Sequence, residues 1–355
     1  MSTKYKILIL GASYGSLLGA KLLMAGHTVK LVCLPAESEL INAEGIRIRM
    51  PVKNHDGLLE LDSQRMAGAL SAGGPESVNP ADYDLVGLAM QEPQYRSPGV
   101  RELLEAVARA KVPCMSIMNM PPLTYLKRVP GIDADGCRSA YTDPTVWDGF
   151  DTASMTLCSP DPQAFRPPEE KVNVLQVRLP TNFKCAAFES AAPNAMLREL
   201  EAGIQAIRLG SDNLELPVKL KVHDSVFVPL AKWAMLMAGN YRCVTADGIR
   251  SIERAVHSDI AATREMYQWV VQLCTDLGAN PSDLVPFEKY ANAALSLQSP
   301  SSAARALGAG ALNIERVDRL VQLVARQKGR SSPVLDETVR LVDEQLESNR
   351  ASKRA

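Results

Sequence analysis

Residues 8–20 read L-I-L-G-A-S-Y-G-S-L-L-G-A, an apolar run followed by a turn with glycines and a second apolar segment. This order predicts a strand, a tight turn and a helix, as in a dinucleotide-binding loop. The usual spacing G-x-G-x-x-G is absent, because Ser13 stands where a second glycine belongs and Gly15 comes one residue early. Gly11 and Gly15 can still make the tight turn and the close helix–strand contact, and the hydroxyls of Ser13 and Ser16 could bind phosphate. A purely structural turn is the alternative.

Apolar runs alternate with helix-length segments over the first half of the chain. Continuous apolar runs are typical of parallel strands covered on both faces. We expect such strands at 6–10, 28–33, 84–90 and 113–118, with helices at 17–25 and 100–110. A looped antiparallel extension of this sheet is expected from strands at 155–158, 172–177 and 183–188, followed by a helix over 194–207. The first half is therefore predicted to be a doubly wound α/β domain.

After residue 222 apolar residues recur at spacings of three and four, which is typical of helices. Helices are expected at 225–237, 249–277, 313–327 and 334–346, and the charged tail at 348–355 is expected to fray. The fold class is thus α/β, an N-terminal Rossmann-type doubly wound sheet followed by an all-α C-terminal domain. We place the dinucleotide-binding domain at 1–220, and the domain for substrate, catalysis and dimerisation at 221–355.

The composition limits which classes of binding partner are expected. Lys and Arg number 39 against 40 Asp and Glu, so no overall field attracts nucleic acid or a membrane surface. No apolar run is long enough to span a bilayer. The seven cysteines form no C-x-x-C pair and the four histidines are dispersed, so no metal site is expected. The chain opens almost directly on a strand, without a secretory signal, and we expect a cytoplasmic homodimer whose partner is a small molecule.

A longer stretch carries a family resemblance. Residues 9–32 read I-L-G-A-S-Y-G-S-L-L-G-A-K-L-L-M-A-G-H-T-V-K-L-V. This run resembles the opening of the ketopantoate reductase family, I-x-G-x-G-x-x-G-x-x-x-x-x-x-L-x-x-x-G-H-x-V, with one loop residue fewer. The family's catalytic domain opens with a lysine that is followed by asparagines four and eight residues later. Here F-V-P-L-A-K-W-A-M-L-M-A-G-N-Y places Lys232 on the lysine and Asn240 on the second asparagine.

The resemblance implies an NAD(P)-dependent oxidoreductase that transfers hydride between nicotinamide and a small 2-oxo or 2-hydroxy acid or a related carbonyl compound. It implies Lys232 as the acid that protonates the developing alkoxide, assisted by Asn119 and Asn240. Taken without the resemblance, Lys232 is a lysine whose stem packs on an apolar helix while its ammonium stays in water. Asn119 is then a strand-end turn residue, and Asn240 a satisfied amide among helices.

The resemblance also assigns the remaining site residues. Those assigned to the NAD(P)(H) cofactor are Gly11, Ala12, Ser13, Tyr14, Gly15, Leu34, Gln91, Asn119 and Thr142. Those assigned to the substrate are Lys232, Asn240, Ser301, Ser302 and a carboxylate near Asn313 to Glu315. Two departures from the family bear on the cofactor: Leu34 replaces an arginine that holds the 2′-phosphate of NADP, and Gln91 replaces a strand-end lysine. NAD and NADP therefore both stay open.

Two other functions are compatible with the sequence. The departures at Leu34 and Gln91 favour a non-catalytic Rossmann protein that binds a nucleotide or metabolite. An opine-type or amine-forming dehydrogenase is the second, because the related clan shares an all-α second domain.

Overall fold

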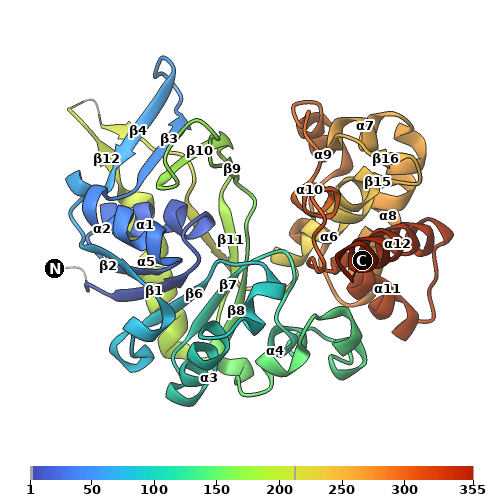
Figure 1. Cartoon of the computed structure of the whole chain (residues 1–355), viewed down its shortest axis with the longest axis horizontal. Coiled ribbons are helices and arrows are strands. Elements are labelled where there is room, and N and C mark those ends of the chain that lie inside the picture. Colours follow the sequence, from blue (N-terminus) through green and yellow to red (C-terminus); the bar gives the residue numbers. More distant parts are fainter. Residues whose placement is uncertain (1–2, 212, 355) are drawn as a thin grey trace. The chain divides into compact units, whose positions relative to one another are not determined.

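The computed structural model describes residues 3–211 and 213–354, which form two compact units (Figure 1). The first unit comprises residues 3–90, 94–125 and 146–224. The second comprises residues 91–93, 126–145 and 225–354. The two short segments of the second unit lie far from the rest of it in the sequence, and no sequence signal marked them.

An eight-stranded sheet forms the centre of the first unit, in the order β14-β11-β8-β7-β6-β1-β2-β5. The six strands from β5 to β8 are parallel and have the order of a doubly wound dinucleotide-binding sheet. β11 is antiparallel to β8, and β14 is parallel to β11. The strands are β1 (Lys6–Leu10), β2 (Thr28–Val32), β5 (Leu70–Gly73), β6 (Leu85–Leu88), β7 (Cys114–Ile117), β8 (Met155–Ser159), β11 (Phe183–Ala186) and β14 (Leu220–His223).

The strands predicted from apolar runs are confirmed where they are buried on both faces. Ile7 to Leu10 of β1 are each 1% exposed or less, because β2 and β6 flank the strand and α1 covers it. The short β5 was not predicted, since L-S-A-G has little apolar signal. The helices of this unit are α1 (Tyr14–Met24), α2 (Pro35–Glu44), α3 (Val100–Ala110) and α5 (Ala191–Ala206), and α4 (Leu123–Leu126) follows β7.

A second, four-stranded sheet in the first unit has the order β4-β3-β10-β9. Its strands are β3 (Arg47–Pro51), β4 (Leu58–Asp62), β9 (Gln163–Phe165) and β10 (Val174–Leu179). The prediction that the strand near 172–177 extends the main sheet is therefore wrong. β10 pairs in parallel with β3, a partner far away in the sequence, and antiparallel with β9. Such non-local pairing leaves no periodic signal in the sequence.

The second unit is helical apart from a two-stranded hairpin, β15 (Val244–Thr245) and β16 (Gly248–Ile249). The helix predicted over 249–277 is divided, because the side chain of Asp259 caps a new helix by accepting from the amide of Ala262. The helices are α6 (Lys232–Met235), α7 (Ile252–His257), α8 (Ile260–Asp276), α9 (Phe287–Ala294), α10 (Ser302–Gly308), α11 (Val317–Gln327) and α12 (Pro333–Arg354).

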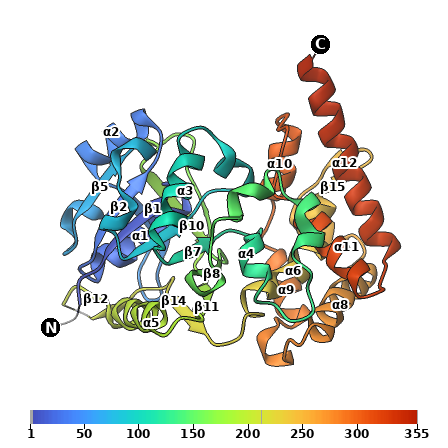
Figure 2. The ribbon, with the colours of Figure 1, turned by 90° about the horizontal axis from the view of Figure 1, so that it is seen from below.

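The tail predicted to fray is helical instead. α12 continues to Arg354 and is the long red helix of Figure 2; residue 355 lies outside the described residues. The amide of Asn349 donates to the carbonyls of Leu307 and Ala311, and this anchors the last turns. No helix among residues 3–211 and 213–354 is long and apolar enough to cross a membrane.

Candidate functional site

The turn after β1 requires glycine at its first position. Gly11 has a φ of +100°, and its amide donates to the carbonyl of Val32 at 2.9 Å. A Cβ at Gly11 would lie 2.7 Å from the carbonyl oxygen of Ala89, which follows β6. In the sheet, β2 lies on one side of β1 and β6 lies on the other side. The loop after β1 and the loop after β6 therefore meet at the switch point where doubly wound sheets bind ligands.

Gly15 allows the first turn of α1 to lie close to β1. A Cβ at this position would lie 2.7 Å from Cγ2 of Ile9, so only glycine fits without displacement. Farther along the same helix a Cβ at Gly19 would make an ordinary contact of 3.5 Å with Val29. The loop, although one residue shorter than usual, thus has the tight-turn glycine and the packing glycine of a dinucleotide site.

The polar residues of this loop have different roles. Ser13 is the half-buried N-cap of α1, and its side chain makes no capping hydrogen bond. The prediction that Ser16 offers a hydroxyl to phosphate is wrong, because this side chain is buried and donates to the carbonyl of Ala12. Ala12 is itself buried. The phenol of Tyr14 donates to the carbonyl of Pro162 at 3.0 Å, so the chain before β9 lies against the loop.

The end of β2, where dinucleotide sites hold the adenosine ribose, carries a charged pair. Leu34 is 74% exposed and is the N-cap of α2. In the first turn of α2, Glu37 accepts a hydrogen bond from the guanidinium of Arg166, which follows β9. Burial raises the pKa of the Cys33 thiol to about 11; the carboxylate of Glu37 adds to this and Arg166 opposes it. Glu37 and Arg166 are therefore both close to Cys33.

Asn119 follows β7 at the same carboxyl edge of the sheet. Its Oδ1 atom is buried and accepts no hydrogen bond from any described residue. A buried acceptor without a donor destabilises the protein, and such atoms usually meet a water or a ligand. The glycines that permit close backbone approach and this unpaired amide oxygen fit a nicotinamide dinucleotide laid across the edge.

In the second unit Lys232 and Asn240 lie on one interrupted helix. α6 begins at Lys232 and passes into a π-helical stretch, Leu236–Asn240. Eight residues exceed two ordinary α-helical turns, so in a regular helix the two side chains would point in different directions. The wider π turn takes up the extra residue and returns Asn240 to the side of Lys232. Both residues are half-buried.

Hydrogen bonds connect Asn240 to Ser301, and its neighbour Tyr241 to Glu315. The hydroxyl of Ser301 donates to the carbonyl of Asn240 at 2.7 Å, and it also caps α10 by accepting from Ala304. The hydroxyl of Tyr241 donates to the main-chain carbonyl of Glu315 and accepts from the amide of Val317. The structure therefore brings Asn240, Ser301 and Glu315 together.

Glu92 is a buried carboxylate of this cluster that the sequence did not indicate. It is 2% exposed, and its carboxylate accepts from the amide and hydroxyl of Thr142 at 3.0 and 2.9 Å. Its own amide donates to the carboxylate of Glu315 at 3.3 Å. Burial raises the pKa of Tyr141 well above its ordinary value, and Glu92 and Glu315 raise it further. The sequence signal available for Glu92 was its place next to Gln91, where the family has a strand-end lysine.

Two of the other predicted residues of the second unit lie at the surface. Gln91 and Ser302 are exposed. Asn313 accepts a hydrogen bond from Arg350 at 3.4 Å. The helix predicted from residue 313 begins instead at Val317, so Asn313 and Glu315 stand in the loop before it. Glu315 is buried, whereas Asn313 is half-buried.

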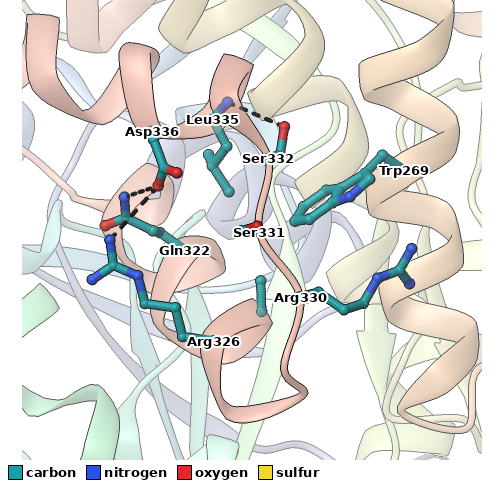
Figure 3. A pocket seen from close by; sticks show the side chains of 9 residues that line it. Trp269, Gln322, Arg326, Arg330, Ser331, Ser332, Leu335 and Asp336 are labelled. Atoms are coloured by element: carbon teal, nitrogen blue, oxygen red, sulfur yellow. Dashed lines mark hydrogen bonds and ion pairs between the residues drawn. The ribbon is translucent and has the colours of Figure 1, made fainter.

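A pocket of the second unit contains none of the predicted residues (Figure 3). Asp336 accepts from Gln322 at 2.5 Å and lies 3.6 Å from Arg326. Arg330 pairs with Asp276 and lies over the ring of Trp269. Its charged side chains are thus paired with one another or with neighbouring residues. In the described part of the chain no group of three or more His, Cys, Asp or Glu side chains could hold a metal ion.

Solved structures share this fold over nearly the whole chain, whereas no family model and no curated protein sequence matches. A 2-dehydropantoate 2-reductase from Methylococcus capsulatus is 14% identical, with a TM-score of 0.63 and 97% of each chain covered. A D-mandelate dehydrogenase, solved with NADH and anilino(oxo)acetate, is 14% identical, with a TM-score of 0.62 over 97% of this chain and 99% of that one. A dimeric ketopantoate reductase from Staphylococcus aureus is 11% identical, with a TM-score of 0.60 over 97% and 99%. The chain has the fold of ketopantoate reductases, and the resemblance inferred from the N-terminal motif is confirmed at the level of the fold.

Proposed function

We propose that this protein is an NAD(P)-dependent oxidoreductase that transfers hydride between nicotinamide and a small 2-oxo or 2-hydroxy acid or a related carbonyl compound. The observation that carries the proposal is the loop at the switch point of the sheet. Gly11 and Gly15 hold positions at which a side chain would collide with Ala89 or Ile9, and the unpaired oxygen of Asn119 lies at the same edge. Proteins with this fold include an NADH-bound dehydrogenase.

The residues divide the chemistry between them. Backbone amides at the start of α1 would hold the pyrophosphate, and the amide oxygen of Asn119 would accept a hydrogen bond from the cofactor. The bound nicotinamide supplies or accepts the hydride. Lys232 would donate a proton to the oxygen of the carbonyl as it becomes an alkoxide, and Asn240, farther along the same helix, would orient that oxygen.

The carboxylate of Glu315 would bind a polar group of the substrate. The hydroxyl of Tyr241 donates to the main-chain carbonyl of Glu315, and the amide of Glu92 donates to its carboxylate. A carboxylate fixed in this way favours a hydroxyl or amine donor on the substrate. We further propose a homodimer, in keeping with the dimeric reductase of the same fold, and a location in the cytoplasm.

A non-catalytic nucleotide-binding protein is a second candidate, favoured by Leu34 and Gln91 in place of the family's two cations. One experiment separates the two. NADH and NADPH are titrated by nicotinamide fluorescence, and consumption of the bound cofactor is then followed with a panel of 2-oxo acids, each with and without ammonium. Binding with turnover supports the oxidoreductase, and binding without turnover on any carbonyl supports the binding protein. Turnover that requires ammonium indicates the amine-forming dehydrogenase, and absence of binding overturns all three.

A further inference from the structure

The charged pair at the end of β2 gives the adenosine half of the site a cofactor preference. We infer that Glu37, held by Arg166, reads the ribose of the dinucleotide and makes the protein specific for NAD(H) over NADP(H). This inference rests on the proposed function, because it concerns the same dinucleotide site. Glu37 and Arg166 both lie outside the glycine loop.

The position of Glu37 supports this role. Dinucleotide sites of this fold bind the ribose hydroxyls with an acidic residue that follows the second strand. Leu34, where the family has the arginine that binds the 2′-phosphate, is 74% exposed and has an apolar side chain. The next acidic side chain is Glu37, one helical turn later, which is only 13% exposed.

Arg166 orients the carboxylate of Glu37. Its guanidinium donates to Oε1 of Glu37 from a side chain that is 31% exposed. This contact leaves Oε2 of Glu37 as an acceptor for a ribose hydroxyl. A 2′-phosphate at the same place would meet the carboxylate, and Arg166 would have to leave Glu37 in order to bind it.

The chain that carries Arg166 also lies along the dinucleotide loop. Pro162, just before β9, accepts the hydrogen bond from Tyr14 at the start of α1. Residues 163–165 form β9, and Arg166 follows them directly. One short segment thus contacts the phosphate loop at one end and the ribose position at the other. Arg166 is therefore held where the adenosine half of a bound cofactor would lie.

The test uses calorimetric titration with NADH and NADPH, and with ADP-ribose and its 2′-phosphate, which lack the nicotinamide. The parent should bind NADH and ADP-ribose at least about tenfold more tightly than their phosphorylated forms. Glu37→Gln, which is nearly isosteric, should reduce this ratio by about tenfold or more. Glu39→Gln removes the same charge from an exposed position of α2 and should leave the ratio unchanged. Circular dichroism checks that each variant is folded.

Arg166→Gln distinguishes the opposite assignment. If Arg166 only holds Glu37, its loss should not weaken NADPH more than NADH. Selective loss of NADPH in this variant, or a Glu37→Gln protein with the parent ratio, overturns the inference while the proposed oxidoreductase stands. A parent that binds none of the four ligands overturns the proposed function and the inference together.

Discussion

The hydroxyl of Tyr290 donates a hydrogen bond of 3.1 Å to the carbonyl oxygen of Met235, inside the helix that joins Lys232 to Asn240. Tyr290 reaches this carbonyl across Gly239, where any Cβ would overlap with the hydroxyl. A side chain inserted into a helix in this way is a known cause of local widening. The π turn that brings Asn240 to the side of Lys232 thus depends on a tyrosine from α9 and on a glycine that makes room for it.

The contact between Tyr290 and Gly239 predicts a coupled effect. Gly239→Ala should destabilise the protein by about 1–3 kcal/mol, because the added methyl overlaps with the buried phenol. Tyr290→Phe should cost about 1–3 kcal/mol, because the carbonyl of Met235 loses its donor. The double variant should be more stable than the sum of the two effects implies, since removing the hydroxyl makes room for the methyl. Urea unfolding of the four proteins measures this coupling, and strictly additive effects would contradict it.

Much of the first unit could be predicted because its parallel strands are buried on both faces. Strands such as β1 read as unbroken apolar runs, and the glycine turn after β1 marks where the first helix begins. The second sheet could not be predicted, because β3 and β10 find each other across more than a hundred residues of other structure. A half-buried strand such as β3 alternates exposure, and its apolar signal is weak.

The candidate site was predictable only where a motif carries the chemistry. Gly11 and Gly15 could be assigned from their positions in a strand–turn–helix. At both positions a side chain would collide with a neighbouring residue, as expected for such a loop. Glu92 could not be assigned, because its role comes from Thr142 and Glu315, which reach it from distant parts of the chain. The π turn could not be foreseen either, since its cause lies in another helix.

The glycines of α1 supply a matched pair of variants. Gly15→Ala should weaken binding of nicotinamide dinucleotides by at least about tenfold, because its Cβ would press on Ile9 and move the helix start away from the phosphates. Gly19→Ala adds the same methyl to the same helix at an ordinary contact distance. It should leave binding unchanged and stabilise the protein by about 0.5–1 kcal/mol. Fluorescence titration and thermal unfolding of both variants check this, and equal binding by the two would place the dinucleotide elsewhere.

A buried lysine predicts how stability varies with pH. Lys21 of α1 is 1% exposed and donates to the carbonyl of Pro217 at 2.6 Å, and burial lowers its pKa to about 7. Between this value and the ordinary lysine pKa the unfolded chain binds more protons than the folded one, so stability rises with pH in that range. The free energy of unfolding should gain about 2 kcal/mol between about pH 7 and about pH 9 from this residue. Lys21→Met should lose that gain in urea unfolding at the two pH values, whereas Lys53→Met, at an exposed position, should keep it.

The proposed mechanism depends most on Lys232. If its ammonium protonates the alkoxide, Lys232→Ala should lower turnover by roughly 10²–10⁴-fold, the usual effect of removing a general acid. Cofactor affinity should change little, because the ammonium serves the reacting oxygen and not the phosphates. Asn119→Ala and Asn240→Ala should lower turnover less, since they disturb orientation and leave the proton source in place.

The pH profile separates proton donation by Lys232 from a structural role. In the parent, carbonyl reduction should slow as the pH rises into the range where a lysine ammonium loses its proton, because only the charged form can donate. The residual activity of Lys232→Ala should lack this decline. The measurement is steady-state kinetics on a carbonyl substrate found by screening, with cofactor binding determined separately on the same proteins. A Lys232→Ala enzyme with near-parent turnover would return the residue to the role of a lysine that packs its stem on an apolar helix and keeps its charge in water.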